Sequence, residues 1–232
     1  MGASFDRVAP YYGVLERLSF GSALQRARCA FLDAGCFDAE VPRRALLVGE
    51  GEGRFACALQ RRFPQAALVI VDSSPVQVAR ARSRLGGLDG VARAEATFLV
   101  RDVLADEGAL DDVEACDFIA TPFFLDCFEG ADLAAVVARI AARAAGTATW
   151  VVSDFAPAGH GLGRLRRVAW QTLLYGFFQR AASVRARRVD DPSPLLERHG
   201  FELSARRDLR CGLLTTSLWR KRAQVSHDGT VL

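Results

Sequence analysis

Short apolar runs alternate with helical patterns from residue 45 onward. Five runs have the length and composition of buried strands: 45–48, 67–71, 96–100, 115–120 and 147–152. Helical periodicity is expected between them, at 54–63, 75–85 and 133–145. This alternation predicts an α/β domain whose mostly parallel sheet is covered by helices on both faces.

The two ends of the chain show a different pattern. Residues 1–40 carry a helical rhythm, and Ser22 is expected to cap a second helix there. Residues 163–181 predict a long amphipathic helix, basic at its start and aromatic later, and a short helix follows at 192–199. Two final strands, at 201–207 and 213–219, are separated by a short turn, so we expect them to pair antiparallel.

Composition excludes several classes of protein. The net charge of +3, from 30 basic and 27 acidic residues, is too balanced for a nucleic-acid-coating protein. None of the six cysteines forms a C-x-x-C pair, which favours reduced thiols and a cytoplasmic location over disulfides or zinc. No apolar run approaches the roughly 20 residues of a membrane span, so stable membrane insertion is not expected, although peripheral contact stays open.

A glycine loop follows the first strand. Gly49, Gly51 and Gly53 alternate with two glutamates, and the next strand ends in Asp72. Glycine permits a tight turn and close approach of a ligand, and an acid about 20 residues further on accepts hydrogen bonds from ribose hydroxyls. This constellation predicts an adenosyl ligand.

The spacing of the loop distinguishes between adenosyl ligands. The third glycine comes one residue sooner than in the dinucleotide fingerprint, and Glu50 and Glu52 stand where phosphate would lie. Two carboxylates repel phosphate and favour a cation. S-adenosylmethionine carries an ammonium, a sulfonium and no phosphate, so it fits this loop better than NAD.

The sequence ALLVGEGEG at residues 45–53 resembles motif I of the Rossmann-like, class I S-adenosylmethionine-dependent methyltransferases. The resemblance implies a seven-stranded sheet with an antiparallel C-terminal strand. It also departs from the family, because Leu47 replaces the acid that usually precedes the first glycine by two positions, and Glu50 is the candidate to supply that charge. The implied cofactor-binding residues are Gly49, Glu50, Gly51 and Gly53 at the methionine part, Asp72 and Ser73 at the ribose, Asp102 and Val103 at the adenine, and Thr121 near the methyl group.

The N-terminal sequence FDRVAPYY at residues 5–12 is similar to the opening of the ubiquinone/menaquinone C-methyltransferases, where this segment folds over the cofactor. FFLDCF at 123–128 and SDF at 153–155 resemble an uncharacterised bacterial methyltransferase group. We therefore divide the chain into a helical lid at 1–42, a methyltransferase domain at 43–222 and a tail at 223–232. Within the domain, the helical segment 163–199 is expected to cover the substrate.

Methyl transfer requires an acceptor held in line with the methyl group in a site that excludes water, and a base only where the acceptor loses a proton. Candidate catalytic residues near the expected edge of the sheet are Asp126, His160 and Tyr12, with Asp154 as a further acid. Each also has a structural interpretation: Asp126 as a turn cap, His160 as a solvated loop residue, and Tyr12 as a cover over the cofactor. No set of metal ligands can be assembled from the sequence.

These observations predict a methyltransferase that uses S-adenosylmethionine and acts on a small, largely apolar acceptor. A quinol or phenol, methylated on carbon or oxygen, fits the phenylalanines at 123, 124 and 128 if some of them line a pocket rather than fill the core. The alternatives are a non-catalytic regulatory module that binds the cofactor, or a repurposed fold that uses it for another reaction. The acceptor, the methylated atom and the oligomeric state stay open.

Overall fold

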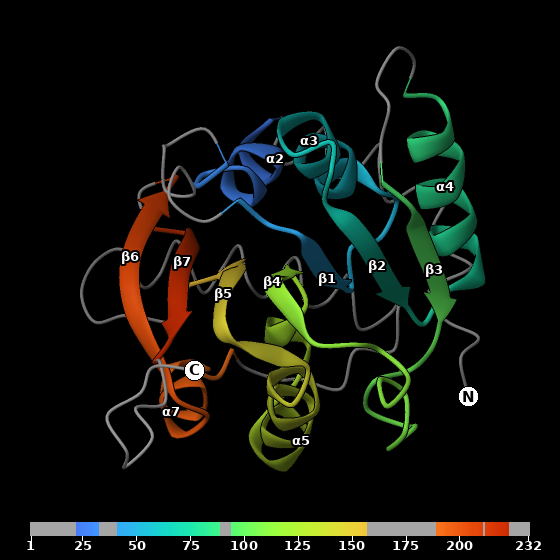
Figure 1. The fold of residues 1–232 in the computed structure, drawn as a ribbon. Coiled ribbons are helices and arrows are strands. Elements are labelled where there is room, and N and C mark those ends of the chain that lie inside the picture. The colour runs from blue at the N-terminus through green and yellow to red at the C-terminus, as the bar shows by residue number, and fades with distance from the viewer. Residues whose placement is uncertain (1–21, 33–40, 89–93, 157–188, 211, 223–232) are drawn as a thin grey trace, which may run out of the picture.

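The computed structural model describes residues 22–32, 41–88, 94–156, 189–210 and 212–222. One twisted sheet runs through the molecule, with helices packed on each of its faces (Figure 1). The strands are β1 (Arg44–Val48), β2 (Ala67–Asp72), β3 (Ala96–Val100), β4 (Cys116–Pro122), β5 (Ala144–Phe155), β6 (Phe201–Leu209) and β7 (Leu214–Lys221). The helices are α2 (Ala23–Arg28), α3 (Arg54–Arg62), α4 (Pro75–Gly86), α5 (Gly130–Ala141) and α7 (Ser193–Arg198), with a 3-10 turn, η1 (Leu125–Cys127).

The sheet has seven strands in the order β3-β2-β1-β4-β5-β7-β6. The first five strands in this order pair parallel, and β7 runs antiparallel to both β5 and β6. The predicted α/β fold with an antiparallel C-terminal strand is therefore confirmed. Because the parallel strands share one direction, the loops after β1, β2, β4 and β5 meet at one edge of the sheet.

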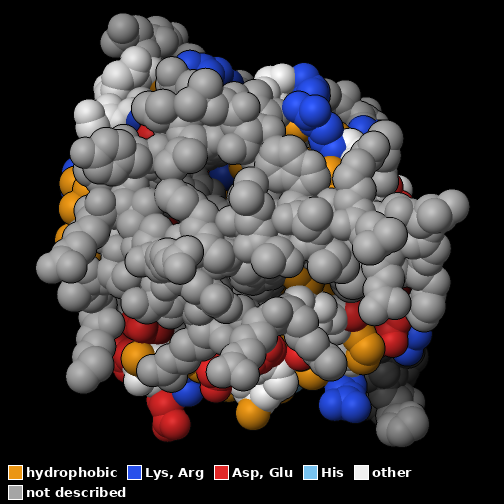
Figure 2. All heavy atoms as spheres, turned by 180° about the vertical axis from the view of Figure 1, so that it is seen from behind, with side chains coloured by type: hydrophobic (Ala, Val, Ile, Leu, Met, Phe, Trp, Pro, Cys, Tyr) orange, Lys and Arg blue, Asp and Glu red, His pale blue; other side chains and the backbone are white. Residues whose placement is uncertain are grey.

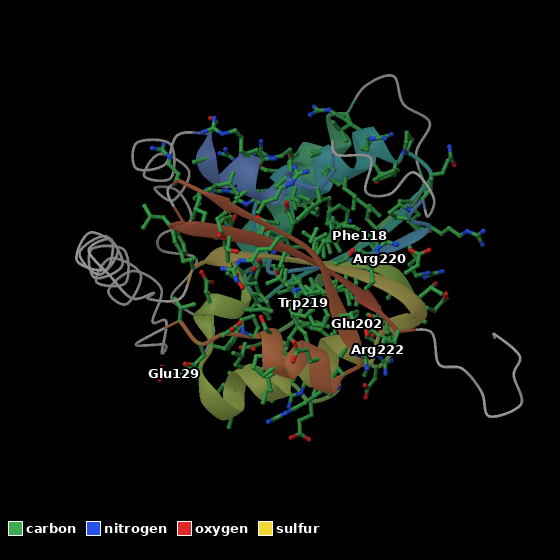
Figure 3. The ribbon with its side chains drawn as sticks, turned by 90° about the vertical axis from the view of Figure 1, so that its left-hand side faces the viewer. Phe118, Glu129, Glu202, Trp219, Arg220 and Arg222 are labelled. Atoms are coloured by element: carbon green, nitrogen blue, oxygen red, sulfur yellow. The ribbon has the colours of Figure 1, made fainter. Side chains whose placement is uncertain are left out.

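The sheet separates two apolar layers. Phe118 belongs to the layer beneath α2, α3 and α4, whereas Trp219 belongs to the layer beneath α5 and α7, and Figure 3 shows the two side chains on opposite faces. Trp150 is fully buried in the second layer and packs edge-on against Phe201 at 5.4 Å between ring centroids. Each fully buried large apolar side chain stabilises the fold by about 1.5–3 kcal/mol, so these two layers hold the sheet edge in place.

Local signals set most helix boundaries. Ser74 caps α4 by accepting a hydrogen bond from the backbone N–H of Gln77, and Pro75 occupies the first turn. Ser22 precedes α2, but its side chain makes no cap hydrogen bond to the backbone and instead accepts one from Arg26. The cap expected at Ser22 is therefore wrong, although a helix does begin there.

The Ala-rich segment after η1 departs from its prediction. The helix expected at 133–145 is α5, which runs from Gly130 to Ala141, and β5 already begins at Ala144. Ala144 pairs with Cys116 of β4, so sheet pairing overrides the helical preference of alanine. Most of the predicted lid lies outside the described residues, which within 1–42 are 22–32 and 41–42. The helix expected at 163–181 and the tail at 223–232 also lie outside them.

Basic and acidic side chains gather in different parts of the molecule. Helices α2, α3 and α4 contain arginines but no Asp or Glu, whereas acids gather in the loop 102–114. Figure 2 shows blue side chains at the upper edge of the molecule, where these helices lie in Figure 1, and red ones along the lower edge.

Among the described residues, no helix is long and apolar enough to cross a membrane. Cys29, Cys57, Cys116 and Cys127 are free thiols.

Candidate active site

The glycine loop between β1 and α3 has three residues in the left-handed region. Gly49, Gly51 and Gly53 have φ values of +68°, +70° and +84°. A Cβ atom on Gly53 would lie 2.7 Å from the Cα atom of Ala81 in α4, and one on Gly49 would meet the ring of Phe124. A Cβ on Gly51 would meet no atom of the described residues within 4 Å. Two glycines therefore allow the chain to pack against itself, and Gly51 faces space that the described part of the chain leaves open.

Asp72, at the end of β2, supports this loop. Its Oδ2 atom accepts a hydrogen bond from the backbone N–H of Gly51 at 3.1 Å, and its Oδ1 atom accepts one from Ser74 at 2.9 Å. Both bonds fix the carboxylate beside Gly51. Because each carboxylate oxygen has two lone pairs, Asp72 retains acceptor capacity for a ligand such as a ribose.

Asp102, after β3, has a similar local arrangement. Its Oδ1 atom accepts hydrogen bonds from the backbone N–H groups of Leu104 and Ala105, each at 3.0 Å. Val103, expected beside the adenine, is buried, whereas Ser73, expected at the ribose, is exposed. The structure therefore places these predicted cofactor residues in the loops after β2 and β3, which are neighbouring strands.

Glu50 has a structural partner within the loop itself. Its Oε1 atom accepts hydrogen bonds from the backbone N–H groups of Phe55 at 2.6 Å and Ala56 at 3.1 Å, at the start of α3. Burial raises the pKa of Glu50 to about 7, against the opposing effects of these N–H groups and of the Arg28 guanidinium. Glu50 thus caps a helix that otherwise begins without a side-chain cap.

Glu52 is also held by the protein. Its carboxylate contacts Arg54 Nε at 2.8 Å and Arg84 Nη2 at 2.9 Å. The electrostatic argument from the sequence, that both glutamates favour a cationic ligand, is therefore weakened, because each carboxylate already has partners in the chain. Leu47 is fully buried in the apolar layer beneath α3, so it offers no substitute for an acid.

The end of β4 packs directly on the glycine loop. Thr121 is fully buried, and its hydroxyl accepts a hydrogen bond from the indole N–H of Trp150 at 3.0 Å. Phe123 adopts a left-handed φ of +56°, which is unusual for a bulky residue, and donates its N–H to the Ser153 carbonyl at 2.5 Å. This turn directs the Phe124 ring onto Gly49.

Two buried carboxyl groups lie beyond this turn. Asp126 in η1 is 6% exposed, and Asp154 near the end of β5 is 4% exposed. Asp126 Oδ2 accepts one hydrogen bond from the Phe155 N–H at 3.3 Å, whereas neither oxygen of Asp154 has a hydrogen-bond partner among the described residues. Asp126 Oδ1 also accepts a hydrogen bond from the Cys127 thiol at 3.7 Å, so Asp154 is the less satisfied member of the pair.

Burial controls the proton affinity of this pair. It raises the pKa of Asp126 to about 6, and it raises the pKa of Asp154 well above its ordinary range, with the Asp126 charge adding to the effect. The pKa of the Cys127 thiol is raised well above its ordinary value by burial and by the charges of Asp126, Asp154 and Asp72. Cys127 therefore lies within electrostatic reach of both the carboxyl pair and the acid that supports Gly51.

Sequence reasoning found some of these residues and missed others. Tyr12 and His160 lie outside the described residues. The sequence identifies Asp154 as a further candidate acid, but nothing in the sequence shows that it lies beside Asp126. Arg28 was missed: it is 7% exposed, lies 5.2 Å from the centre of the Phe123 ring and is close enough to Glu50 to lower its pKa. Among the described residues, no group of three His, Cys, Asp or Glu side chains is placed to hold a metal.

The geometry agrees with comparisons to known proteins. Residues 45–157 match the family model described as a methyltransferase domain. This span runs from β1 through β5 and includes the glycine loop, Asp72, Asp102 and both buried carboxyl groups. A search of curated proteins found no match. The family match assigns a methyltransferase domain to this span, which is where the sequence predicts one.

Solved structures share the fold at low sequence identity. The chain is similar to mitomycin 7-O-methyltransferase, with a TM-score of 0.67 and 18% identity over 95% of this chain and 61% of that one. It is also similar to an O-methyltransferase family protein from Burkholderia thailandensis, with a TM-score of 0.64 and 18% identity over 92% and 59%. Magnesium protoporphyrin IX methyltransferase from Synechocystis, solved with bound S-adenosylhomocysteine, gives a TM-score of 0.63 and 17% identity over 85% and 83%. The chain thus spans about three fifths of the first two proteins.

Proposed function

We propose that this protein transfers a methyl group from S-adenosylmethionine to a small, largely apolar acceptor bound where β4 and β5 end. The observation that carries the proposal is the space at Gly51 left open by the described residues, beside a carboxylate that the loop itself fixes in place. Asp72 also supports the loop, and it retains acceptor capacity toward this space. The described residues therefore suit the adenosyl part of the cofactor.

Particular residues would hold the cofactor. Gly51 permits close approach, Asp72 would accept hydrogen bonds from the ribose hydroxyls, and Asp102 with Val103 would border the adenine. The Synechocystis methyltransferase, which shares this fold, was solved with the demethylated product of this cofactor. When bound, S-adenosylmethionine supplies a methyl group on a sulfonium that is already a good leaving group, so the protein needs only to position the acceptor and exclude water.

The acceptor end of the site combines aromatic rings with carboxyl groups. Phe123 and Phe155 pack at 5.5 Å between ring centroids, and Phe124 and Phe128 pack at 5.0 Å. Phe124 and Phe128 pack with the apolar layer beneath α5, and Phe123 and Phe155 pack beside α2. Apolar side chains of this kind favour a flat or apolar acceptor, such as a phenol or a quinol. A purely regulatory module that binds the cofactor would not need buried carboxyl groups at this position, which favours the enzyme over that alternative.

Titration calorimetry with S-adenosylmethionine and S-adenosylhomocysteine tests the cofactor site. We expect micromolar binding by the wild type and a loss of about 10- to 100-fold in Asp72→Ala, because hydrogen bonds to a charged group are each worth about 1.5–3 kcal/mol. Asp112→Asn is the matched control, since Asp112 is exposed and pairs with Arg101 away from the glycine loop. Absence of binding by the folded wild type would contradict the proposed function.

A further inference from the structure

Burying the Asp154 carboxyl group without a hydrogen-bond partner costs free energy of folding. It lies in β5 between Ser153 and Phe155, it is 4% exposed, and both of its carboxyl oxygens lack a hydrogen-bond partner among the described residues. A buried polar group left unpaired costs about 1–3 kcal/mol, and an unpaired charge costs more. A fold retains such a group where a ligand or a reaction uses it.

The position of Asp154 agrees with the proposed site. Trp150, Val152 and Asp154 alternate along β5 and face the α5 layer, and Asp154 comes last, at the edge where parallel strands end. Asp126 reaches the same place from the loop after β4, and it accepts a hydrogen bond from Phe155, the residue next to Asp154. Two adjacent strands of the sheet therefore bring two carboxyl groups together.

The other acidic side chains of the site accept more hydrogen bonds from the backbone than Asp154 does. Asp72 and Asp102 each accept two backbone hydrogen bonds, and Glu50 accepts two from α3. Against these, Asp126 accepts one long bond from the Phe155 backbone and one from the Cys127 thiol at 3.7 Å. The backbone N–H groups of Asp126 and Phe124 lie close enough to Asp154 to lower its pKa, against burial and the Asp126 charge, which raise it.

We propose that Asp126 and Asp154 bind the hydroxyl or amino group of an aromatic methyl acceptor, with Asp126 receiving its proton and Asp154 positioning it. This inference rests on the proposed function and names the acceptor end of the same site. The required chemistry is a hydrogen-bond donor on an aromatic body, because carboxyl oxygens accept hydrogen bonds and the neighbouring phenylalanine rings provide apolar contact.

The step balances without a further reactant. A lone pair on the acceptor oxygen or nitrogen forms the bond to the methyl carbon as the carbon–sulfur bond breaks, and the sulfur keeps the electron pair as a neutral sulfide. The proton of the acceptor passes to the Asp126 carboxylate and then to solvent. Burial raises the pKa of Asp126 to about 6, and burial together with the Asp126 charge raises the pKa of Asp154 well above its ordinary range, so the two carboxyl groups differ in proton affinity.

Three matched probes test the acceptor class: 1-naphthol, 1-naphthylamine and 1-methylnaphthalene, which lacks a hydroxyl or amino group. With S-adenosylmethionine present, we expect the wild type to methylate naphthol or naphthylamine and to leave methylnaphthalene unchanged, as measured by mass spectrometry and by release of S-adenosylhomocysteine. Asp126→Asn should lower kcat by about 100-fold or more, the usual contribution of a general base. Asp154→Asn should raise KM by about tenfold with a smaller change in kcat.

Further readouts separate a catalytic role from a structural one. The wild-type kcat/KM should rise with pH through about 6 as Asp126 ionises, and this rise should disappear in Asp126→Asn. Infrared spectroscopy should show a protonated carboxyl band at pH 7 that is lost in Asp154→Asn, independently of any acceptor. Asp117→Asn is the matched control, since Asp117 lies at the opposite end of β4 and accepts hydrogen bonds from the backbone of Arg43 and Arg44.

The inference is overturned if the cofactor-loaded wild type methylates neither protic probe, or if both variants retain wild-type kinetics. Retention of the protonated carboxyl band in Asp154→Asn would also overturn it. Calorimetry distinguishes these results from failure of the proposed function, which would appear as a wild type that does not bind S-adenosylmethionine at all. Both variants should bind the cofactor with an affinity within about threefold of the wild type.

Discussion

The glycine loop and the carboxyl pair lie at the same edge of the sheet, but their carboxyl groups differ in how many hydrogen bonds they accept from the backbone. In and beside the glycine loop, Glu50 and Asp72 each accept two backbone hydrogen bonds. At the ends of β4 and β5, Asp126 accepts one backbone bond and one from the Cys127 thiol, and neither oxygen of Asp154 has a hydrogen-bond partner among the described residues. Glu50 Oε2 also lacks such a partner, but Asp154 differs from Glu50 in that both of its oxygens do.

The two regions are therefore suited to a ligand in different ways, one by its shape and the other by its proton affinity. The glycine loop has a fixed conformation, because its left-handed residues leave room at Gly51 and its carboxyl groups accept hydrogen bonds from the loop backbone. The carboxyl pair suits proton transfer, because burial raises the proton affinity of both groups by more than the nearby N–H and thiol groups lower it. The first suits a cofactor that the protein only binds, and the second suits a group that exchanges a proton.

The largest effect should come from closing the space that the glycine loop needs for packing. Gly53→Ala would place a Cβ atom 2.7 Å from the Ala81 Cα atom, at a residue with φ of +84°. Overpacking and left-handed strain together should lower the free energy of unfolding by about 4 kcal/mol in urea denaturation. Gly87→Ala is the control, since a Cβ there would meet only ordinary contacts at 3.7 Å. Equal stability of the two variants would refute a rigid loop.

Glu50→Gln tests whether the loop tolerates a buried charge. Because the pKa of Glu50 is raised from 4.5 to about 7, its contribution to stability is present at low pH and is lost as pH rises between these values. Glutamine keeps the acceptor for Phe55 and does not ionise. The variant should match the wild type below about pH 4 and exceed its free energy of unfolding by about 3 kcal/mol at pH 9. Glu114→Gln, at an exposed position, should show no such pH dependence.

Gly51→Ala should have the smallest effect on folding and a selective effect on the ligand. A Cβ there meets no atom of the described residues within 4 Å, so the cost to stability comes from the left-handed φ of +70° and is about 1–2 kcal/mol. The same methyl group would enter the space proposed for the cofactor, and the affinity for S-adenosylhomocysteine should fall at least tenfold in calorimetry. An unchanged affinity would place the cofactor elsewhere.

The sequence by itself determined the fold and the glycine loop, because both depend on local order along the chain. Alternating apolar runs require a covered parallel sheet, and glycines between a strand and a helix require a turn that other residues enter at a cost. Asp72 could be identified because the length of one β-α-β unit sets its distance from the loop. These features follow from neighbours within about 30 residues.

Only the tertiary structure decided how the acids are used. Glu50 and Glu52 look alike in the sequence, yet one caps α3 and the other pairs with Arg84 from a separate helix. The start of β5 at Ala144 depends on pairing with Cys116, which outweighs the helical preference of the alanines. Asp126 and Asp154 come together only because β4 and β5 are neighbours, and their raised pKa values arise from burial. Hydrogen-bond partners and desolvation depend on residues far apart in the chain, so no local pattern could have specified them.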